Sequence, residues 1–226
     1  MILQLRYSHM IQPRPTRLDP RKTPRQARST ATVEAIRTAT IQVLLADGAA
    51  RLTTTRVAQR AGVSVGTMYQ YYPHKQALLF AILEQKLDMV EAAMLAAAEA
   101  LVGRDLETIA HGLAGAWLDA KTTDIEASRA IYGIAAGFDI AARMARGADR
   151  LRQGIGRVLA TAPDARFADV DATAFMMVAL LAGSTRAVLE HGASDRDLEL
   201  LRRELPRACH AYLAAARACG DAGSPR

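Results

Sequence analysis

Aromatic side chains make up only 5% of this 226-residue sequence, and it contains just two cysteines, Cys209 and Cys219. On one predicted helix these thiols would stand ~15 Å apart, which is too far for a mutual disulfide. The sequence therefore excludes a fold stapled by disulfides, and we interpret both residues as ordinary small thiols.

Long hydrophobic runs are also missing. The longest, Phe175 to Gly183, is about half of the ~20 residues that are needed to span a bilayer. The first ten residues lack the sustained apolar core of a signal peptide. We therefore expect a cytoplasmic protein that has no membrane partner.

The usual signatures of catalysis and metal binding are absent too. The five histidines are scattered, and no metal-ligand spacing, nucleophile elbow or phosphate-binding loop occurs. We therefore predict no catalytic residue, no metal and no cofactor. An enzyme that binds a small molecule remains only a remote alternative.

Helix-forming residues dominate what is present. Half of the residues are apolar, Ala, Leu and Arg are abundant, and no alternating strand pattern or internal repeat occurs. The sequence therefore predicts an all-α fold. The expected helices are 26–46, 53–60, 64–72, 74–101, Leu106–Lys121, Ile125–Ala136, Phe138–Thr161, Val170–His191 and Asp195–Ala218.

Positive charge is concentrated near the N-terminus. Residues 1–75 hold twelve of the 29 Lys and Arg residues but three of the 23 Asp and Glu residues, a net charge of +9, whereas the remainder carries −3. Residues 1–24 are rich in Pro and Arg, and we expect them to form a disordered basic arm. The asymmetry indicates that the N-terminal part binds a polyanion.

A helix-turn-helix motif is predicted between residues 53 and 72. Ala58 is the small residue where the two helices touch, Gly62 supplies the turn, and Thr53 or Thr54 and Ser64 can cap the helices. The apolar residues that would lock the angle between the helices are Val57, Ala61, Val63 and Met68. A second helix held in this way can enter the major groove of DNA.

The outward residues of this second helix suit DNA. We expect Val65, Gly66, Thr67, Tyr69, Gln70 and Tyr71 to face outward. Gln70 can pair with adenine and Val65 can contact a thymine methyl group, while Gly66 lets the backbone approach closely. Lys75 begins the next helix, where the helix dipole helps it to contact a phosphate.

The segment resembles the DNA-binding domain of TetR-family transcriptional regulators, whose signature is T-x-x-x-[IV]-A-x-x-A-G-V-S-x-G-x-x-Y-x-[YH]-[FY]-x-x-K. The sequence matches it at Thr54, Val57, Ala58, Ala61, Gly62, Val63, Ser64, Gly66, Tyr69, Tyr71, Tyr72 and Lys75. The resemblance implies a DNA-binding domain at about residues 30–90. Val65 and Gln70 depart from the residues common there, which leaves the operator sequence open.

The resemblance also implies roles for individual residues. Thr54, Tyr69, Tyr71 and Lys75 would contact the phosphate backbone, and Val65, Gly66, Thr67 and Gln70 would face base edges. We add Thr55 and Ser64 to the predicted DNA-binding residues, and we expect Tyr72 to lie in the core. Arg25 and Arg28 are further candidates, for the minor groove or for phosphates, although a merely solvated charge run is an alternative.

Residues 91–226 are expected to form a larger helical domain for effector binding and dimerisation. The segment Val170–His191 is apolar nearly all round, and Leu198, Leu201, Leu205, Ala208 and Tyr212 form a short heptad seam. By resemblance, the last two helices pair with those of a second copy. The predicted interface residues are Phe175, Leu180, Leu181, Leu198, Leu201, Leu205 and Tyr212. The alternative is a monomer that buries the same faces internally.

The middle helices combine a few large side chains with several glycines. By resemblance they enclose a pocket for a small effector, and the candidate ligand-binding residues are His111, Trp117, Tyr132, Phe138, Met144 and Met177. Ordinary close packing of the helices is the alternative for each of these residues.

These features together favour a ligand-responsive repressor. A homodimer would bind a palindromic operator in double-stranded DNA, and a small hydrophobic or amphipathic effector would release it. An activator or a ligand-independent DNA-binding regulator is the alternative.

Overall fold

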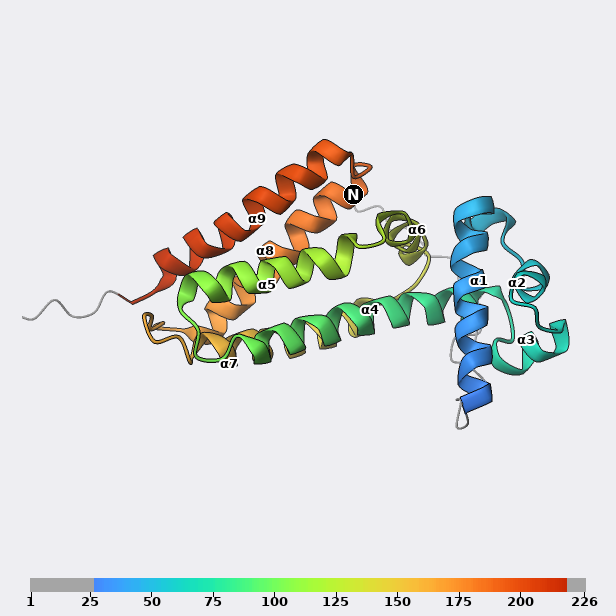
Figure 1. Cartoon of the computed structure of the whole chain (residues 1–226), viewed down its shortest axis with the longest axis horizontal. Helices are drawn as coiled ribbons and strands as arrows, with labels where there is room; N and C mark the ends of the chain where they lie inside the picture. The colour runs from blue at the N-terminus through green and yellow to red at the C-terminus, as the bar shows by residue number, and fades with distance from the viewer. Residues whose placement is uncertain (1–26, 219–226) are drawn as a thin grey trace, which may run out of the picture.

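The computed structural model describes residues 27–218, with side chains from Ser29 onward, and these residues form nine α-helices and no β-strand (Figure 1). The all-α prediction is confirmed. The helices are α1 (Ala27–Arg51), α2 (Thr54–Arg60), α3 (Val65–Tyr71), α4 (Lys75–Ala100), α5 (Leu106–Thr122), α6 (Ile125–Ala135), α7 (Ala141–Leu159), α8 (Val170–Glu190) and α9 (Asp195–Ala216). The predicted basic arm, Arg25 and Cys219 lie outside the described residues.

Most helix boundaries fall within two residues of the prediction because capping residues mark them. The side chains of Thr53, Ser64 and Asp105 each accept a hydrogen bond from a backbone N–H in the first turn of the helix that follows. Two boundaries differ more. α7 starts at Ala141 because the preceding residues form a turn, in which Phe138 donates its N–H to the Ala135 carbonyl.

The first helix also ends later than predicted. It continues to Arg51, although Gly48 interrupts it with a backbone φ of 75° and ψ of 165°. Glycine adopts this positive φ without the steric penalty that a Cβ would bring. Gly48 therefore breaks the regular helix, and a further turn follows the break.

The N-terminal end of the molecule, α1 to α3, has its own apolar core. One face of α1 is buried against α2, α3 and the first part of α4, and it carries Val33, Ile36, Thr40 and Val43. In Figure 1, α2 and α3 lie at the extreme right end of the molecule, and α1 stands between them and the rest of the chain. The outer surface of α3 is therefore free to meet a large partner.

Helix α4 joins this end to the larger domain. It runs along most of the length of that domain in Figure 1, and its second half packs against α5 and α7. Met94 of α4 lies in the main core together with Leu113, Ile155, Met177 and Leu205 from α5, α7, α8 and α9. Any rearrangement of this core must act on α4, which begins directly after α3.

Acidic residues of α4 also hold α7 through arginines. Arg143 of α7 has a side chain that is 10% exposed, and it lies 2.6 Å from Asp88 and 3.3 Å from Glu91. Arg150 pairs with Glu91 as well. Its hydrogen bond to the Glu91 carboxylate holds the pKa of that carboxyl below the usual value. We call Glu84, Asp88, Glu91, Arg143 and Arg150 the α4–α7 charge cluster.

Candidate nucleic-acid interface

The α2–turn–α3 unit has the geometry of a helix-turn-helix. Gly62 adopts a φ of 68°, and the next residue, Val63, donates its backbone N–H to the Ala58 carbonyl at 3.0 Å. Ala58 and Met68 are fully buried where the two helices meet. The predicted roles of Ala58, Gly62 and Met68 in the turn are confirmed.

Helix α3 turns small and polar residues outward. Ser64 caps it, since its hydroxyl accepts the Thr67 N–H at 3.0 Å. Val65 and Tyr69 are 37% and 43% exposed, and Gly66 and Gln70 are exposed too, whereas Thr67 is half-buried. Four predicted base-reading positions are thus on or near the outer surface, where a base edge can reach them.

A pair of hydroxyls joins the two helices. The Thr54 hydroxyl lies 3.3 Å from the Tyr69 phenol oxygen, and Thr54 itself is buried while Thr55 beside it is exposed. Thr53, rather than Thr54, caps α2. Such paired hydroxyls next to a free helix N-terminus can donate to phosphate oxygens.

The position of Tyr71 corrects one prediction. This side chain was expected to face outward, but it is only 6% exposed, and its phenol lies 2.8 Å from the Ser29 hydroxyl. Tyr71 therefore ties α3 to the start of α1. Tyr72 is buried, as predicted, and its burial raises the pKa of its phenol.

Lys75 has protein partners that the sequence did not reveal. Its ammonium donates to the backbone carbonyls of Ala49 and Ala50 at the end of α1. The preceding residue, His74, caps α4 by accepting the Ala77 N–H at its Nδ1. Lys75 thereby joins the end of α1 to the start of α4, and its predicted contact with a phosphate would have to use the remaining donor.

Sequence reasoning missed two arginines beside this surface. Arg56 of α2 is paired with Asp47 at 2.8 Å, and Arg60 donates to the Gln42 side chain at 2.7 Å. These bonds attach α2 to α1. Both side chains are also exposed, so they add positive charge next to α3. A helical projection of α2 would have placed both across the helix from the buried Ala58, because each lies two positions away from it.

The structure does not gather the predicted effector residues into one site. Met177 lies in the main core, and Trp117 is buried with its indole N–H donated to the Thr185 hydroxyl at 2.9 Å. Phe138 packs near Phe80, with ring centroids 5.6 Å apart. His111 and Met144 are exposed. Of the six, Tyr132 alone borders the large hollow described next.

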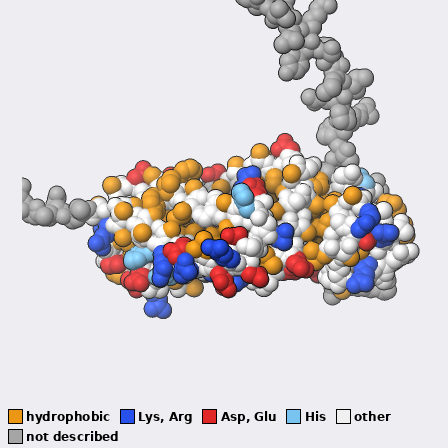
Figure 2. All heavy atoms as spheres, turned by 90° about the horizontal axis from the view of Figure 1, so that it is seen from above, with side chains coloured by type: hydrophobic (Ala, Val, Ile, Leu, Met, Phe, Trp, Pro, Cys, Tyr) orange, Lys and Arg blue, Asp and Glu red, His pale blue; other side chains and the backbone are white. Residues whose placement is uncertain are grey.

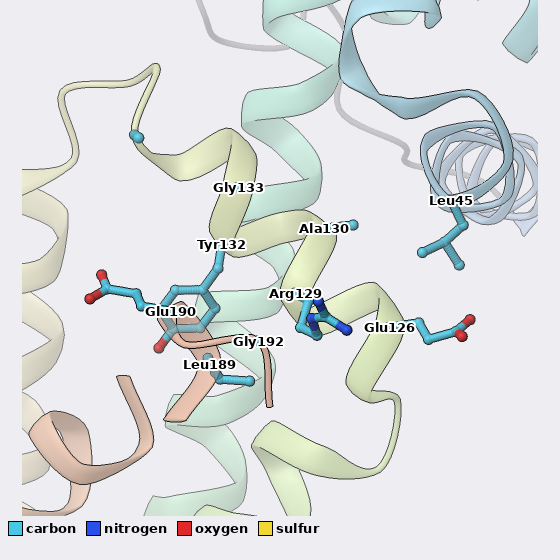
Figure 3. A pocket seen from close by; sticks show the side chains of 10 residues that line it. Leu45, Glu126, Arg129, Ala130, Tyr132, Gly133, Leu189, Glu190 and Gly192 are labelled. Atoms are coloured by element: carbon cyan, nitrogen blue, oxygen red, sulfur yellow. The ribbon is translucent and has the colours of Figure 1, made fainter. Parts of the chain in front are cut away.

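A hollow of about 720 Å³ lies between α1, α6 and the end of α8 (Figure 3). Apolar side chains from all three helices line it, including Leu45 of α1, Tyr132 of α6 and Leu189 of α8. Arg129 lies between Tyr132 and Glu126 on α6, and Glu190 stands beside the Tyr132 phenol. Because Leu45 belongs to α1 at the N-terminal end, this hollow touches both parts of the molecule.

The predicted dimer interface needs a correction. Leu181, Leu198, Leu201 and Leu205 are buried inside the chain's own core, and Leu180 and Tyr212 are partly buried against it. Most of the heptad seam of α9 packs on α5, so this face of α9 is covered within the chain. Only Phe175 of the seven is largely exposed.

A different face of α8 and α9 remains uncovered. Phe175 and Met176 are 59% and 46% exposed, and Ala179 and Gly183 continue the stripe along α8. On α9, Leu200 is 47% exposed and Ala208 and Ala211 follow it. Seen from above, hydrophobic side chains gather over this end of the molecule beside a band of charged ones (Figure 2). We call these seven residues the α8–α9 face.

Helix α8 is apolar enough, by length and composition, to cross a membrane, but one third of its apolar window is buried in the chain. A helix of this kind needs a cover on its remaining side.

Two family models match the chain. The model described as bacterial regulatory proteins of the tetR family matches residues 36–82, and the model described as a tetracyclin repressor-like C-terminal domain matches residues 105–213. The first match contains the α2–turn–α3 unit, and the second extends from α5 to α9. A comparison with curated proteins finds no significant match.

Solved structures share the fold. SmeT, the repressor of the multidrug efflux pump SmeDEF of Stenotrophomonas maltophilia, is 20% identical with a TM-score of 0.62 over 84% of this chain and 94% of its own. SmeT in complex with triclosan is 22% identical with a TM-score of 0.54 over 87% and 99%. A TetR-family regulator from Mesorhizobium loti is 17% identical with a TM-score of 0.62 over 85% and 100%. Because the two family models together cover most of the chain, the protein belongs to the TetR family of transcriptional regulators.

Proposed function

We propose that the protein is a cytoplasmic repressor that binds a palindromic operator as a homodimer and is released by a small amphipathic effector. The observation that carries this proposal is the outward surface of α3. Gly66 and Gln70 are exposed there, next to the Thr54–Tyr69 hydroxyl pair. Operator binding requires hydroxyls or other donors that contact the DNA backbone beside a helix that contacts the bases.

A second copy of the chain supports specificity. One seven-residue recognition helix reads few base pairs, so a regulator needs two of them about one DNA turn apart, ~34 Å. The α8–α9 face offers an apolar surface for this purpose, at the end of the molecule away from α3 (Figure 1). Its small residues, Ala179, Gly183 and Ala208, allow helices from two copies to approach closely.

An effector could act through the hollow between α1, α6 and α8. A ligand there would touch Leu45 at the DNA-binding end and Leu189 in the larger domain. It releases DNA only if it binds more tightly to the spacing of α3 helices that does not fit the operator. The solved complex of SmeT with triclosan supports an effector of this general kind.

A DNA-shift assay on the region upstream of the protein's own gene tests the proposal. We expect a salt-sensitive, sequence-selective complex, and Gln70→Ala should weaken it tenfold or more on its preferred site, since one bidentate base contact contributes about 1–3 kcal/mol. Gln153→Ala is the control, because Gln153 is an exposed glutamine on α7. Equal loss in both variants, or no selective complex on any selected DNA, would contradict operator binding.

A further inference from the structure

A lysine is buried in the larger domain without an acidic partner. Lys121, in the last turn of α5, is only 7% exposed. Its ammonium forms no ion pair and no hydrogen bond with any residue that the structure describes. A buried charge of this kind is unfavourable unless something pairs with it.

Two aromatic rings enclose this ammonium. Its nitrogen lies 5.1 Å from the centroid of Trp117 and 5.3 Å from that of Tyr132. Cation–π contacts of this sort offset part of the desolvation but do not neutralise the charge. Burial, helped by the nearby charge of Lys86, lowers the pKa of Lys121 to about 8.

The neighbouring polar groups divide into satisfied and unsatisfied ones. Lys86 donates its ammonium to the Ala120 carbonyl at 2.9 Å, and Trp117 donates to Thr185. By contrast, the hydroxyl of Ser128 is buried and has no hydrogen-bond partner among residues 27–218, and it lies one turn before Tyr132 on α6. The corner between α5 and α6 thus holds one unpaired cation and one unpaired hydroxyl.

The same corner adjoins the hollow. Tyr132 lines the hollow, and the face of its ring is in contact with Lys121. A shift of the Tyr132 side chain would connect the 720 Å³ hollow with the ammonium behind it. An apolar body could then occupy the hollow, beside Leu45 and Leu189, while a polar head reaches Lys121.

We propose that the effector is an amphipathic monocarboxylate whose carboxylate pairs with Lys121 between Trp117 and Tyr132. One negative charge fits because Lys121 is a buried cation with no acceptor among the described residues, whereas Lys86 is already bonded. A carboxylate also offers lone pairs to the free hydroxyl of Ser128. This inference names the effector class and therefore rests on the proposed function.

The chain contains a natural fluorescent probe of this site. Trp117 is its single tryptophan, and it touches the proposed anchor. Fluorescence of the full-length protein can be titrated with two matched pairs of probes, 4-phenylbutyrate against 4-phenylbutanol and decanoate against decanol. We expect each carboxylate to bind at least tenfold more tightly than its alcohol and to change the Trp117 emission.

Three variants test which positive charge pairs with the carboxylate. Lys121→Met should weaken carboxylate binding at least tenfold and leave alcohol binding unchanged, and Lys121→Arg should retain most of the preference. Arg129→Gln is the matched control, because Arg129 is an exposed cation on the rim of the same hollow. Equal binding of acids and alcohols, or a preference lost in Arg129→Gln but kept in Lys121→Met, would overturn the assignment.

A DNA-shift assay in parallel separates the two proposals. Carboxylate binding that depends on Lys121 but leaves the operator complex intact would support the site and contradict the effector's role in release. A selective operator complex in a protein whose Trp117 emission responds to neither carboxylate would support DNA binding and overturn the anionic effector.

Discussion

Gly66 occupies the first turn of α3, where a Cβ would meet only the Ser64 hydroxyl at 3.7 Å, an ordinary contact. The fold therefore has room for alanine, and the reason for glycine at this position must be sought outside the chain. We predict that Gly66→Ala leaves the free energy of unfolding unchanged or raises it by up to ~1 kcal/mol. Operator affinity should fall tenfold or more, because the new methyl group would separate the backbone from the DNA.

Gly115→Ala is a suitable control for this prediction. Its Cβ would meet nothing within 4 Å, and it lies in α5, away from α3. Urea unfolding and a DNA-shift titration of both variants are the measurements. If Gly66→Ala binds the operator as tightly as Gly115→Ala does, the backbone of α3 does not approach the bases.

The burial of Lys121 predicts how the stability of the protein changes with pH. The pKa of its ammonium falls from 10.5 to about 8 on folding, so the unfolded chain binds more protons between these values and the protein becomes more stable as pH rises through them. Below pH 8 the free-energy cost of burying the charged Lys121 ammonium is fully present, at about 3 kcal/mol. We expect Lys121→Met to raise the free energy of unfolding at pH 7 by about 1–3 kcal/mol, since the ring contacts are lost along with the charge.

The stability gain of Lys121→Met should shrink between pH 7 and pH 10, as measured by urea unfolding at each pH. Lys86, whose pKa burial lowers, and Tyr132, whose pKa burial raises, titrate nearby but remain in both proteins, so the difference reports Lys121. A variant that is less stable than the parent at pH 7 would mean that Lys121 has a stabilising partner. Burial raises the pKa of the Cys209 thiol to about 12, but Cys209 is present in both proteins, so its effect on stability cancels in the difference.

At the scale of single elements, the α4–α7 charge cluster joins α4 to α7. Since α4 follows α3 directly, a movement of the core can reach α3 through α4. Arg143 is the central residue, and Gly147 leaves the space that its side chain occupies, since a Cβ there would come within 2.9 Å of the guanidinium. We predict that Arg143→Met lowers the free energy of unfolding by about 1–3 kcal/mol. The loss is smaller than for a fully buried pair because Asp88 and Glu84 can be rehydrated.

Arg157→Met on the same helix is the control, since Arg157 is exposed and forms no ion pair with the described residues; its effect should stay within ~0.5 kcal/mol. The difference in the free energy of unfolding between Arg143→Met and Arg157→Met should become smaller as the pH is lowered. Arg150 and Arg143 lower the pKa of Glu91, so their pairing stabilises the fold above the unfolded pKa of the carboxyl and loses that effect as Glu91 becomes protonated. Equal stabilities of both variants at pH 7 would show that the cluster is merely a surface feature.

Element boundaries could be predicted from the sequence because local chemistry sets them. Ser64 and Asp105 are side-chain caps, and Gly62 and Gly103 adopt a positive φ that favours glycine. The exception at residues 138–140 is also local in origin. Phe138 could continue a helix, but it packs near Phe80 of α4, and this tertiary contact overrides the helical pattern.

At the scale of the whole molecule, the sequence could not show which neighbour covers each apolar face. The leucines Leu198, Leu201 and Leu205 have the spacing of an interface and equally that of an internal seam. The chain itself covers all three: Leu201 and Leu205 lie in the main core, and Leu198 packs in a smaller cluster with residues of α6 and α8. The sequence likewise does not show whether Tyr71 faces outward or inward. In the structure it is buried, with its phenol next to the Ser29 hydroxyl of α1. The other outward residues of α3 were easier to predict, since a sequence motif rather than packing indicates them.

The exposed remainder of α8 and α9 provides the last prediction. If a second copy covers the α8–α9 face, Phe175→Glu will place a desolvated charge in the dimer interface, whereas in an isolated chain this side chain is already 59% exposed. We therefore expect the variant to be folded but monomeric at micromolar concentration, and to bind the operator at least a hundredfold more weakly than the parent. Met89→Glu is a matched control, because Met89 of α4 is 59% exposed as well but lies outside this face. Light scattering combined with a DNA-shift titration measures both properties. A parent protein that is monomeric, or a Phe175→Glu variant that remains dimeric with full affinity, would move the interface elsewhere and leave the spacing of the α3 helices without its proposed cause.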